Sequence, residues 1–246
     1  MEVTIERNGT ETEKIENRLW STKEWHEAFT VQINGKRILT IYTSDNAVMK
    51  KWINEVQKLY GKKKNTFPLI VSVCVDRESK HSRKERPYEI IALCTGSHCL
   101  LYSLPDCYWN KYYNEKDVPK PLLDFLTDSK AIFVGMDIVD VSKKLEKDSM
   151  LKIKRSVDIR GICEQVLGYP MYHMKKFGLD EIAKKMLDKR MEIGRLEIDD
   201  NWIDVESRKY EINKEYVKYL TVDAFFLYEI AVKYLDITTM LVSESK

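Results

Sequence analysis

Apolar and polar residues alternate along residues 29–42, in a pattern with a period of two. Alternate positions on either side of an Asn34-Gly35 pair are apolar or β-branched: Phe29, Val31, Ile33, Ile38, Thr40 and Tyr42. Both residues of a tight two-residue turn take positive φ, which Asn and Gly tolerate best. The pattern therefore predicts a β-hairpin with its turn at Asn34-Gly35.

A helix is predicted directly after the hairpin, because apolar residues then recur at helical spacing. Asp45 is the expected N-terminal cap, and the helix is expected to end at Gly61. Its apolar positions are Val48, Trp52, Val56 and Leu59. Residues 1–24 are polar instead, and we expect them to form a frayed lead-in. One domain is then expected over residues 25–240, with the hairpin and helix at 25–61 and a core at 67–240.

The core of this domain begins with a continuous apolar run from Leu69 to Val75, which predicts a strand buried on both faces. Further strands are predicted at residues 88–93, 99–104, 131–136 and 157–159. Helices are predicted at 121–127 and 142–147, and the longest one at 213–235, with Asn213 as its cap. This order predicts an α/β or α+β fold in which helices pack on a mixed sheet.

Charge and composition exclude several classes of protein. The 41 basic residues nearly balance the 39 acidic ones, so the chain does not bind nucleic acid through bulk charge. No apolar run approaches the roughly 20 residues that cross a bilayer, and the N-terminus resembles no signal or transit peptide. We therefore expect no membrane association and a cytoplasmic or nuclear location. The odd count of five cysteines favours reduced thiols.

The long C-terminal helix carries the most informative pair of polar residues. Tyr219 and Asp223 are four apart, so their side chains leave the same helix face one turn apart. Asp223 lies in an increasingly apolar stretch, where a buried carboxylate needs a partner such as a metal ion.

Several motifs, in this order, resemble those of the DEDDy-type 3′–5′ exonucleases. The residues 215–230 (EYVKYLTVDAFFLYEI) are similar to the final motif of that family, a Tyr followed four residues later by Asp-Ala. The other similar stretches are 69–79 (LIVSVCVDRES), 133–145 (FVGMDIVDVSKKL), 157–168 (VDIRGICEQVLG) and 178–187 (GLDEIAKKML). The hairpin and the helix that follows it resemble the N-terminal part of plant Werner syndrome-like exonucleases.

This resemblance implies a ribonuclease H-like (DnaQ-like) exonuclease fold and a two-metal mechanism. Four carboxylates would hold two Mg²⁺ or Mn²⁺ ions, and the tyrosine would orient the attacking water. On this basis Asp76, Tyr219 and Asp223 are the candidate catalytic residues, with Asp76 and Asp223 as the metal ligands.

Two positions depart from the family pattern. The first motif, Asp-x-Glu, aligns with Cys74 and Asp76, and a thiol is a poor ligand for Mg²⁺. A shift of two residues keeps the strand face and restores the motif as Asp76-Arg77-Glu78.

The third acid of the family aligns with Val141, which cannot bind a metal. Asp140 is adjacent, but one residue turns a helical side chain by about 100°. Asp137 could approach from the preceding loop. Glu78, Asp137 and Asp140 are therefore the candidate substitutes.

Basic residues gather at two places that could contact nucleic acid. Arg83, Lys84 and Arg86 follow the first motif, and Lys143 and Lys144 lie on the helix of the third motif. An aromatic group at residues 108–113 could stack on bases or form a subunit contact.

Two functions remain open from the sequence. The first is a 3′–5′ exonuclease-like protein that binds single-stranded RNA or DNA 3′ ends, its hydrolysis impaired by the loss of acids at Cys74 and Val141. The second is a non-catalytic pseudo-exonuclease, without a metal, that binds nucleic acid or a partner protein, or assembles as a homo-oligomer.

Overall fold

The structure is a computed structural model that describes residues 3–8, 26–62, 68–76, 87–105, 118–187 and 212–235. The strands are β1 (Val3–Arg7), β2 (Glu27–Ile33), β3 (Lys36–Thr43), β4 (Leu69–Asp76), β5 (Ile90–Cys94), β6 (His98–Ser103), β7 (Ala131–Gly135) and β8 (Ser156–Asp158). The helices are α1 (Asn46–Lys62), α2 (Lys120–Leu126), α3 (Ile138–Ser149), α4 (Ile159–Leu167), α5 (Met171–Met174), α6 (Leu179–Leu187) and α7 (Lys214–Tyr234).

The strands form one mixed sheet in the order β1-β2-β3-β6-β5-β4-β7-β8. Strand β3 pairs parallel to β6, and β4, β7 and β8 run parallel to one another. The pairs β1-β2, β2-β3, β4-β5 and β5-β6 are antiparallel. The predicted α/β fold with a central mixed sheet is therefore confirmed.

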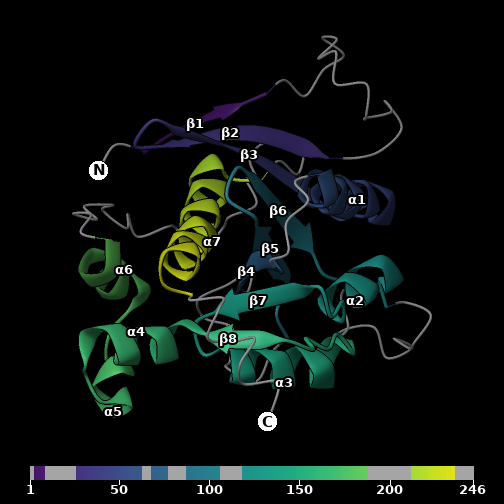
Figure 1. Cartoon of the computed structure of the whole chain (residues 1–246). Helices are drawn as coiled ribbons and strands as arrows, with labels where there is room; N and C mark the ends of the chain where they lie inside the picture. The colour runs from purple at the N-terminus through teal and green to yellow at the C-terminus, as the bar shows by residue number, and fades with distance from the viewer. Residues whose placement is uncertain are drawn as a thin grey trace.

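Helices cover both faces of the sheet and divide the core into two apolar clusters (Figure 1). One cluster contains residues of α4, α6 and α7, and the other contains residues of α1, α2 and α3. Successive residues of β4 alternate between them, with Ile70 and Cys74 toward α7 and Val71 and Val73 toward the other face.

The local signals for the hairpin and α1 are confirmed. Asn34 and Gly35 have φ of 49° and 79°, as the predicted turn requires. The Ala47 backbone N–H donates to Asp45 Oδ1 at 2.7 Å, so Asp45 caps α1. Leu59 differs from the prediction, because its side chain is exposed rather than packed on the sheet.

The expected lead-in contains a strand, so the expectation that it is frayed is wrong for residues 3–7. Strand β1 pairs antiparallel with β2, opposing Val3 to Ile33 and Ile5 to Val31. Arg7 forms a salt bridge with the buried Glu27 at 3.0 Å. The pairing partner lies about 25 residues away, so short-range patterning could not reveal it.

The described residues include no helix that is both long and apolar enough to cross a bilayer.

Candidate active site

Helix α7 lies along β4, joined to it by two hydrogen bonds. Ser72 Oγ donates to the Ala224 carbonyl at 2.6 Å, and Tyr216 Oη donates to Asp76 Oδ2 at 3.1 Å. Four strand residues span about 13 Å and eight helical residues about 12 Å, so the two attachments are equally spaced on both elements. The strand and the helix therefore run in opposite directions with matched lengths.

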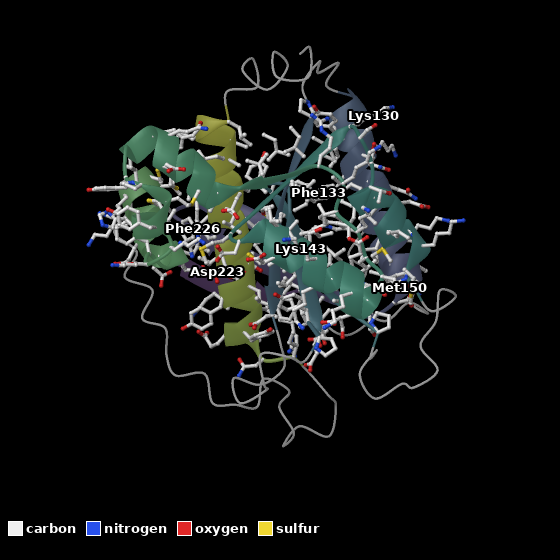
Figure 2. The ribbon with its side chains drawn as sticks, turned by 90° about the horizontal axis from the view of Figure 1, so that it is seen from below. Lys130, Phe133, Lys143, Met150, Asp223 and Phe226 are labelled. Carbon is white, nitrogen blue, oxygen red and sulfur yellow. The ribbon has the colours of Figure 1, made fainter. Side chains whose placement is uncertain are left out.

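This arrangement brings the first and last sequence motifs to one interface. Ser72, Cys74 and Asp76 point to the α7 face of the sheet, because they alternate along β4. Cys74 lies midway between the two attachments, level with the middle of the helical stretch between Tyr216 and Ala224. Tyr219 and Asp223 belong to that stretch, and Figure 2 shows Asp223 on α7.

Asp76 is bound by a tyrosine that the sequence motifs did not single out. Tyr216 is buried, and its pKa lies far above the ordinary value of 10.0, first because of burial and then because of the charge and hydrogen bond of Asp76. The phenol therefore stays protonated and donates to the carboxylate. Tyr216 precedes Tyr219 by three residues and so shares its helix face, which is the signal that could have identified it.

A row of small polar and thiol side chains crosses the sheet beneath α7. In the strand register Ser72 opposes Cys94, Cys94 opposes Cys99, and Thr40 aligns with Cys99. Thr40 Oγ1 and Thr221 Oγ1 are 3.1 Å apart, which joins this row to the helix. Burial and the neighbouring Cys94 raise the pKa of the Cys99 thiol, so this thiol remains uncharged.

The candidate substitute Asp137 is engaged in an ion pair. It precedes α3 with a φ of 53°, and its Oδ1 lies 3.0 Å from Arg160 Nε. The buried Arg160 guanidinium also donates to the carbonyls of Met174 and, at 2.9 Å, of Phe177. The charge of Asp137 thus balances a buried cation that links the start of α3 to the α5 region.

The neighbouring positions on α3 point elsewhere. The side chain of Asp140 is 85% exposed and lies 3.9 Å from the Lys143 ammonium. Val141 packs against the apolar cluster of α1, α2 and α3. The structure therefore joins neither Asp137 nor Asp140 to Asp76 and Asp223 in a metal-binding group.

Asp158 belongs to the similar stretch 157–168 but is not one of the candidate site residues, and its side chain contacts the starts of two helices. Its carboxylate accepts from the backbone N–H of Ile138 at 3.1 Å and of Arg160 at 2.9 Å. Burial raises its pKa, and the charge of Asp137 raises it further. Asp158 therefore has a structural task at the junction of α3 and α4.

Several residues that the sequence predicts for the site or for nucleic-acid contact lie outside the described part of the chain. Glu78, Arg83, Lys84 and Arg86 lie outside the described residues, as does the aromatic group at 108–113. Lys143 is exposed on α3 (Figure 2), whereas Lys144 pairs with Asp148 at 2.6 Å.

Among the described residues, the donors fit only part of the two-metal centre that the resemblance implies. Within the described ranges no three His, Cys, Asp or Glu side chains gather in a way that could hold a metal ion. Position 74 presents a soft thiol, position 141 an apolar side chain, and Asp137 is neutralised by Arg160. Of the residues that the structure describes, Asp76 and Asp223 supply hard oxygen ligands at the positions of the family motifs.

Comparison with known proteins identifies the fold through structure alone. No protein-family profile matches the chain, and no curated protein matches it. The catalytic core of RRP6 from Trypanosoma brucei superposes with a TM-score of 0.54 at 14% identity, over 84% of this chain and 48% of that one. Escherichia coli RNase D, an exoribonuclease involved in structured RNA processing, superposes with a TM-score of 0.51 at 14% identity, over 77% and 43%.

These likenesses confirm the predicted ribonuclease H-like exonuclease fold. The chain spans about half the length of these two structures.

Proposed function

We propose that this chain is a 3′–5′ exonuclease-like protein that binds single-stranded nucleic-acid ends and hydrolyses them slowly or not at all. The observation that supports this proposal is the placement of α7 along β4, which sets Asp76 and Cys74 opposite the helix that carries Tyr219 and Asp223. The arrangement of the site is kept, while part of its ligand set is lost.

The expected impairment follows from the ligands. Mg²⁺ and Mn²⁺ bind hard oxygen donors, and the thiol of Cys74 is a poor substitute. Asp76 already accepts a hydrogen bond from Tyr216, so a metal would compete with a neutral donor for that carboxylate. The similarity to plant Werner syndrome-like exonucleases stays a prediction.

The deciding experiment measures binding and degradation together. Labelled single-stranded RNA and DNA and a duplex with a 3′ overhang are incubated with the chain in Mg²⁺, Mn²⁺ or a chelator. Asp223→Ala is compared with Asp124→Ala, which removes an exposed acid from α2 on the opposite face of the sheet.

We expect binding of single-stranded ends and little shortening. Any shortening should disappear in Asp223→Ala and persist in Asp124→Ala. Rapid metal-dependent degradation would contradict the impairment, and a lack of binding to every substrate would contradict the proposed function as a whole.

The alternative is a non-catalytic protein that binds nucleic acid or another protein without a metal. It is favoured by the Tyr216–Asp76 hydrogen bond, which gives the retained acid a partner other than a metal. The double substitution Cys74→Asp with Val141→Asp separates the two functions, once circular dichroism shows that the variant is folded. A gain of cleavage would show that only ligands were lost, whereas continued inactivity would support the non-catalytic protein.

A further inference from the structure

An exposed aromatic and basic surface lies on the helices that follow β8. Residues 168–177 (GYPMYHMKKF) contain no acid. Figure 1 shows α4, α5 and α6 gathered beside α7, on the side away from α1. We call this surface the α5 platform and define it by its exposed aromatic, histidine and lysine side chains: Tyr169, Tyr172, His173, Lys175, Lys176 and Lys185.

The aromatic rings of the α5 platform are exposed to solvent and contact neighbouring rings. Tyr172 is 64% exposed, and its ring centroid lies 4.2 Å from that of His173. Tyr169 is 41% exposed and packs edge-on against Phe177, with 6.2 Å between centroids. The Lys185 ammonium lies 5.6 Å from the ring centroid of Tyr169. Oriented rings of this kind offer faces on which unpaired bases can stack.

The charges of the platform suit a polyanion. Lys175 and Lys176 are exposed and form no ion pair within the part of the chain that the structure describes. Two nearby acids are turned to the backbone instead. Glu164 Oε1 accepts from the Met171 N–H at 3.0 Å, and Glu181 Oε2 accepts from the Gly178 N–H at 3.2 Å. Neither carboxylate pairs with Lys175 or Lys176 in the described structure, so these ammonium groups can contact phosphates.

The platform is also tied to the candidate active site. Arg160 donates to the carbonyls of Met174 and Phe177 at the two ends of the Lys175–Lys176 pair. The same guanidinium pairs with Asp137 at the start of α3, the element of the third motif. A nucleic-acid strand that binds the platform would thus contact a segment that Arg160 connects to the start of α3.

We propose that the α5 platform binds single-stranded nucleic acid, with bases stacked on Tyr169 and Tyr172 and phosphates contacted by its lysines. The proposal rests on the nucleic-acid binding proposed above and assigns it to a particular surface. The acid-free run of aromatic and basic residues favours a nucleic-acid strand over a protein partner.

Equilibrium binding of the full chain to fluorescent oligouridine and oligothymidine tests the proposal. Tyr172→Ala should weaken binding about fivefold or more, because one stacking face is removed, whereas Tyr172→Phe keeps the ring and should bind like the wild type. Lys175→Ala with Lys176→Ala should reduce the salt dependence of log K by about 1.4, or about 0.7 for each phosphate that is no longer neutralised. Lys50→Ala with Lys58→Ala, on the opposite face of the sheet, is the matched control and should change little.

Photo-crosslinking of oligouridine that carries 4-thiouridine provides a second measurement without substitutions. The crosslinked peptide should contain residues 169–177. If the wild type binds but Tyr172→Ala binds equally well, or the crosslink maps elsewhere, the platform assignment is wrong and the proposed function stands. If the wild type binds no single strand, both fail and a protein partner becomes the explanation for this surface.

Discussion

Tyr216 determines the surroundings of Asp76, a candidate metal ligand, because its phenol donates a hydrogen bond to that carboxylate. The phenol gives the carboxylate a neutral, buried hydrogen-bond donor, so the acid is stabilised without a metal ion. Hydrogen bonds to charged groups are among the stronger ones in proteins, at about 1.5–3 kcal/mol. Tyr216 is therefore expected to contribute to stability as well as to the site.

Replacement of this tyrosine should alter stability in a pH-dependent way. At pH 8, Tyr216→Phe should lower the free energy of unfolding by about 2 kcal/mol, because the hydrogen bond to Asp76 is removed. The pKa of Tyr216 is raised in the folded state, so its contribution is complete below the unfolded value of 10.0. Above that pH the Tyr216 phenol ionises in the unfolded chain but not in the folded chain. The free energy of unfolding of the wild type should therefore fall by about 1.4 kcal/mol per pH unit. Tyr216→Phe lacks the phenol and should not show this fall.

Urea unfolding at pH 8, 10 and 11 measures this difference. Tyr172→Phe, at an exposed ring, is the control and should follow the wild type throughout. A constant gap between wild type and Tyr216→Phe across this range would show that the phenol is not protected from ionisation.

Site residues could be predicted only where their spacing in the sequence puts them on the same face of one helix or strand. Tyr219 and Asp223 share a helix face because they are four residues apart. The pairing of Asp137 with Arg160 joins residues 23 positions apart across an element boundary, and the spacing of neither motif reports it. For the same reason the sequence makes Asp137 a candidate substitute for the third acid, although the fold uses it to balance the buried cation of Arg160.

At the scale of elements, the hairpin, the buried strand and the capped helices could be predicted because each carries a local signal. Asn213 is an example, since its side chain accepts from the Glu215 N–H at 2.8 Å at the start of α7. Strand β1 carries too few residues for such a signal. Its stability comes from its pairing with β2 and from the contacts of Arg7.

The Arg7–Glu27 pair provides a test of how firmly β1 is attached. Arg7→Ala leaves a buried carboxylate without its cation and should lower the free energy of unfolding by about 3 kcal/mol. Adding Glu27→Gln should recover about 1–2 kcal/mol, because the buried charge that lost this cation is then removed and the acceptor for the Ile212 N–H is kept.

Chemical denaturation of the two variants and of Arg37→Ala, an exposed arginine on β3, measures these costs. The control should change stability by less than about 0.5 kcal/mol. Equal losses in Arg7→Ala and in the double variant would argue against a buried ion pair.

At the scale of the whole molecule, the sheet separates two apolar cores. Helix α7 covers the core that lies beside the candidate site. Gly96, between β5 and β6, illustrates how closely the helix fits. It has a φ of 89°, and a Cβ there would lie 2.8 Å from the Tyr228 ring of α7. This close packing shields the thiols of the central strands, while Cys74 is only half-buried near the end of β4.

Thiol alkylation of the native protein should show how well α7 shields the cysteines beneath it. N-ethylmaleimide at neutral pH should modify Cys74 before Cys94, Cys99 and Cys163, which are buried. Burial raises the pKa of Cys163 to about 11, so its thiolate fraction is about 100-fold below that of an ordinary cysteine. Peptide mass spectrometry over time assigns each thiol, and denatured protein serves as the control. Early modification of Cys94 or Cys99 would contradict the close fit of α7.

The two hydrogen bonds that join α7 to β4 also bear on how this kind of protein can evolve. Ser72 and Tyr216 hold the helix to the strand at two distant points, and neither interaction uses a metal or the residue at position 74. The residue at position 74 can therefore change without removing either contact. Under the proposed function, substitutions at position 74 would therefore change cleavage while these two contacts keep the helix in place.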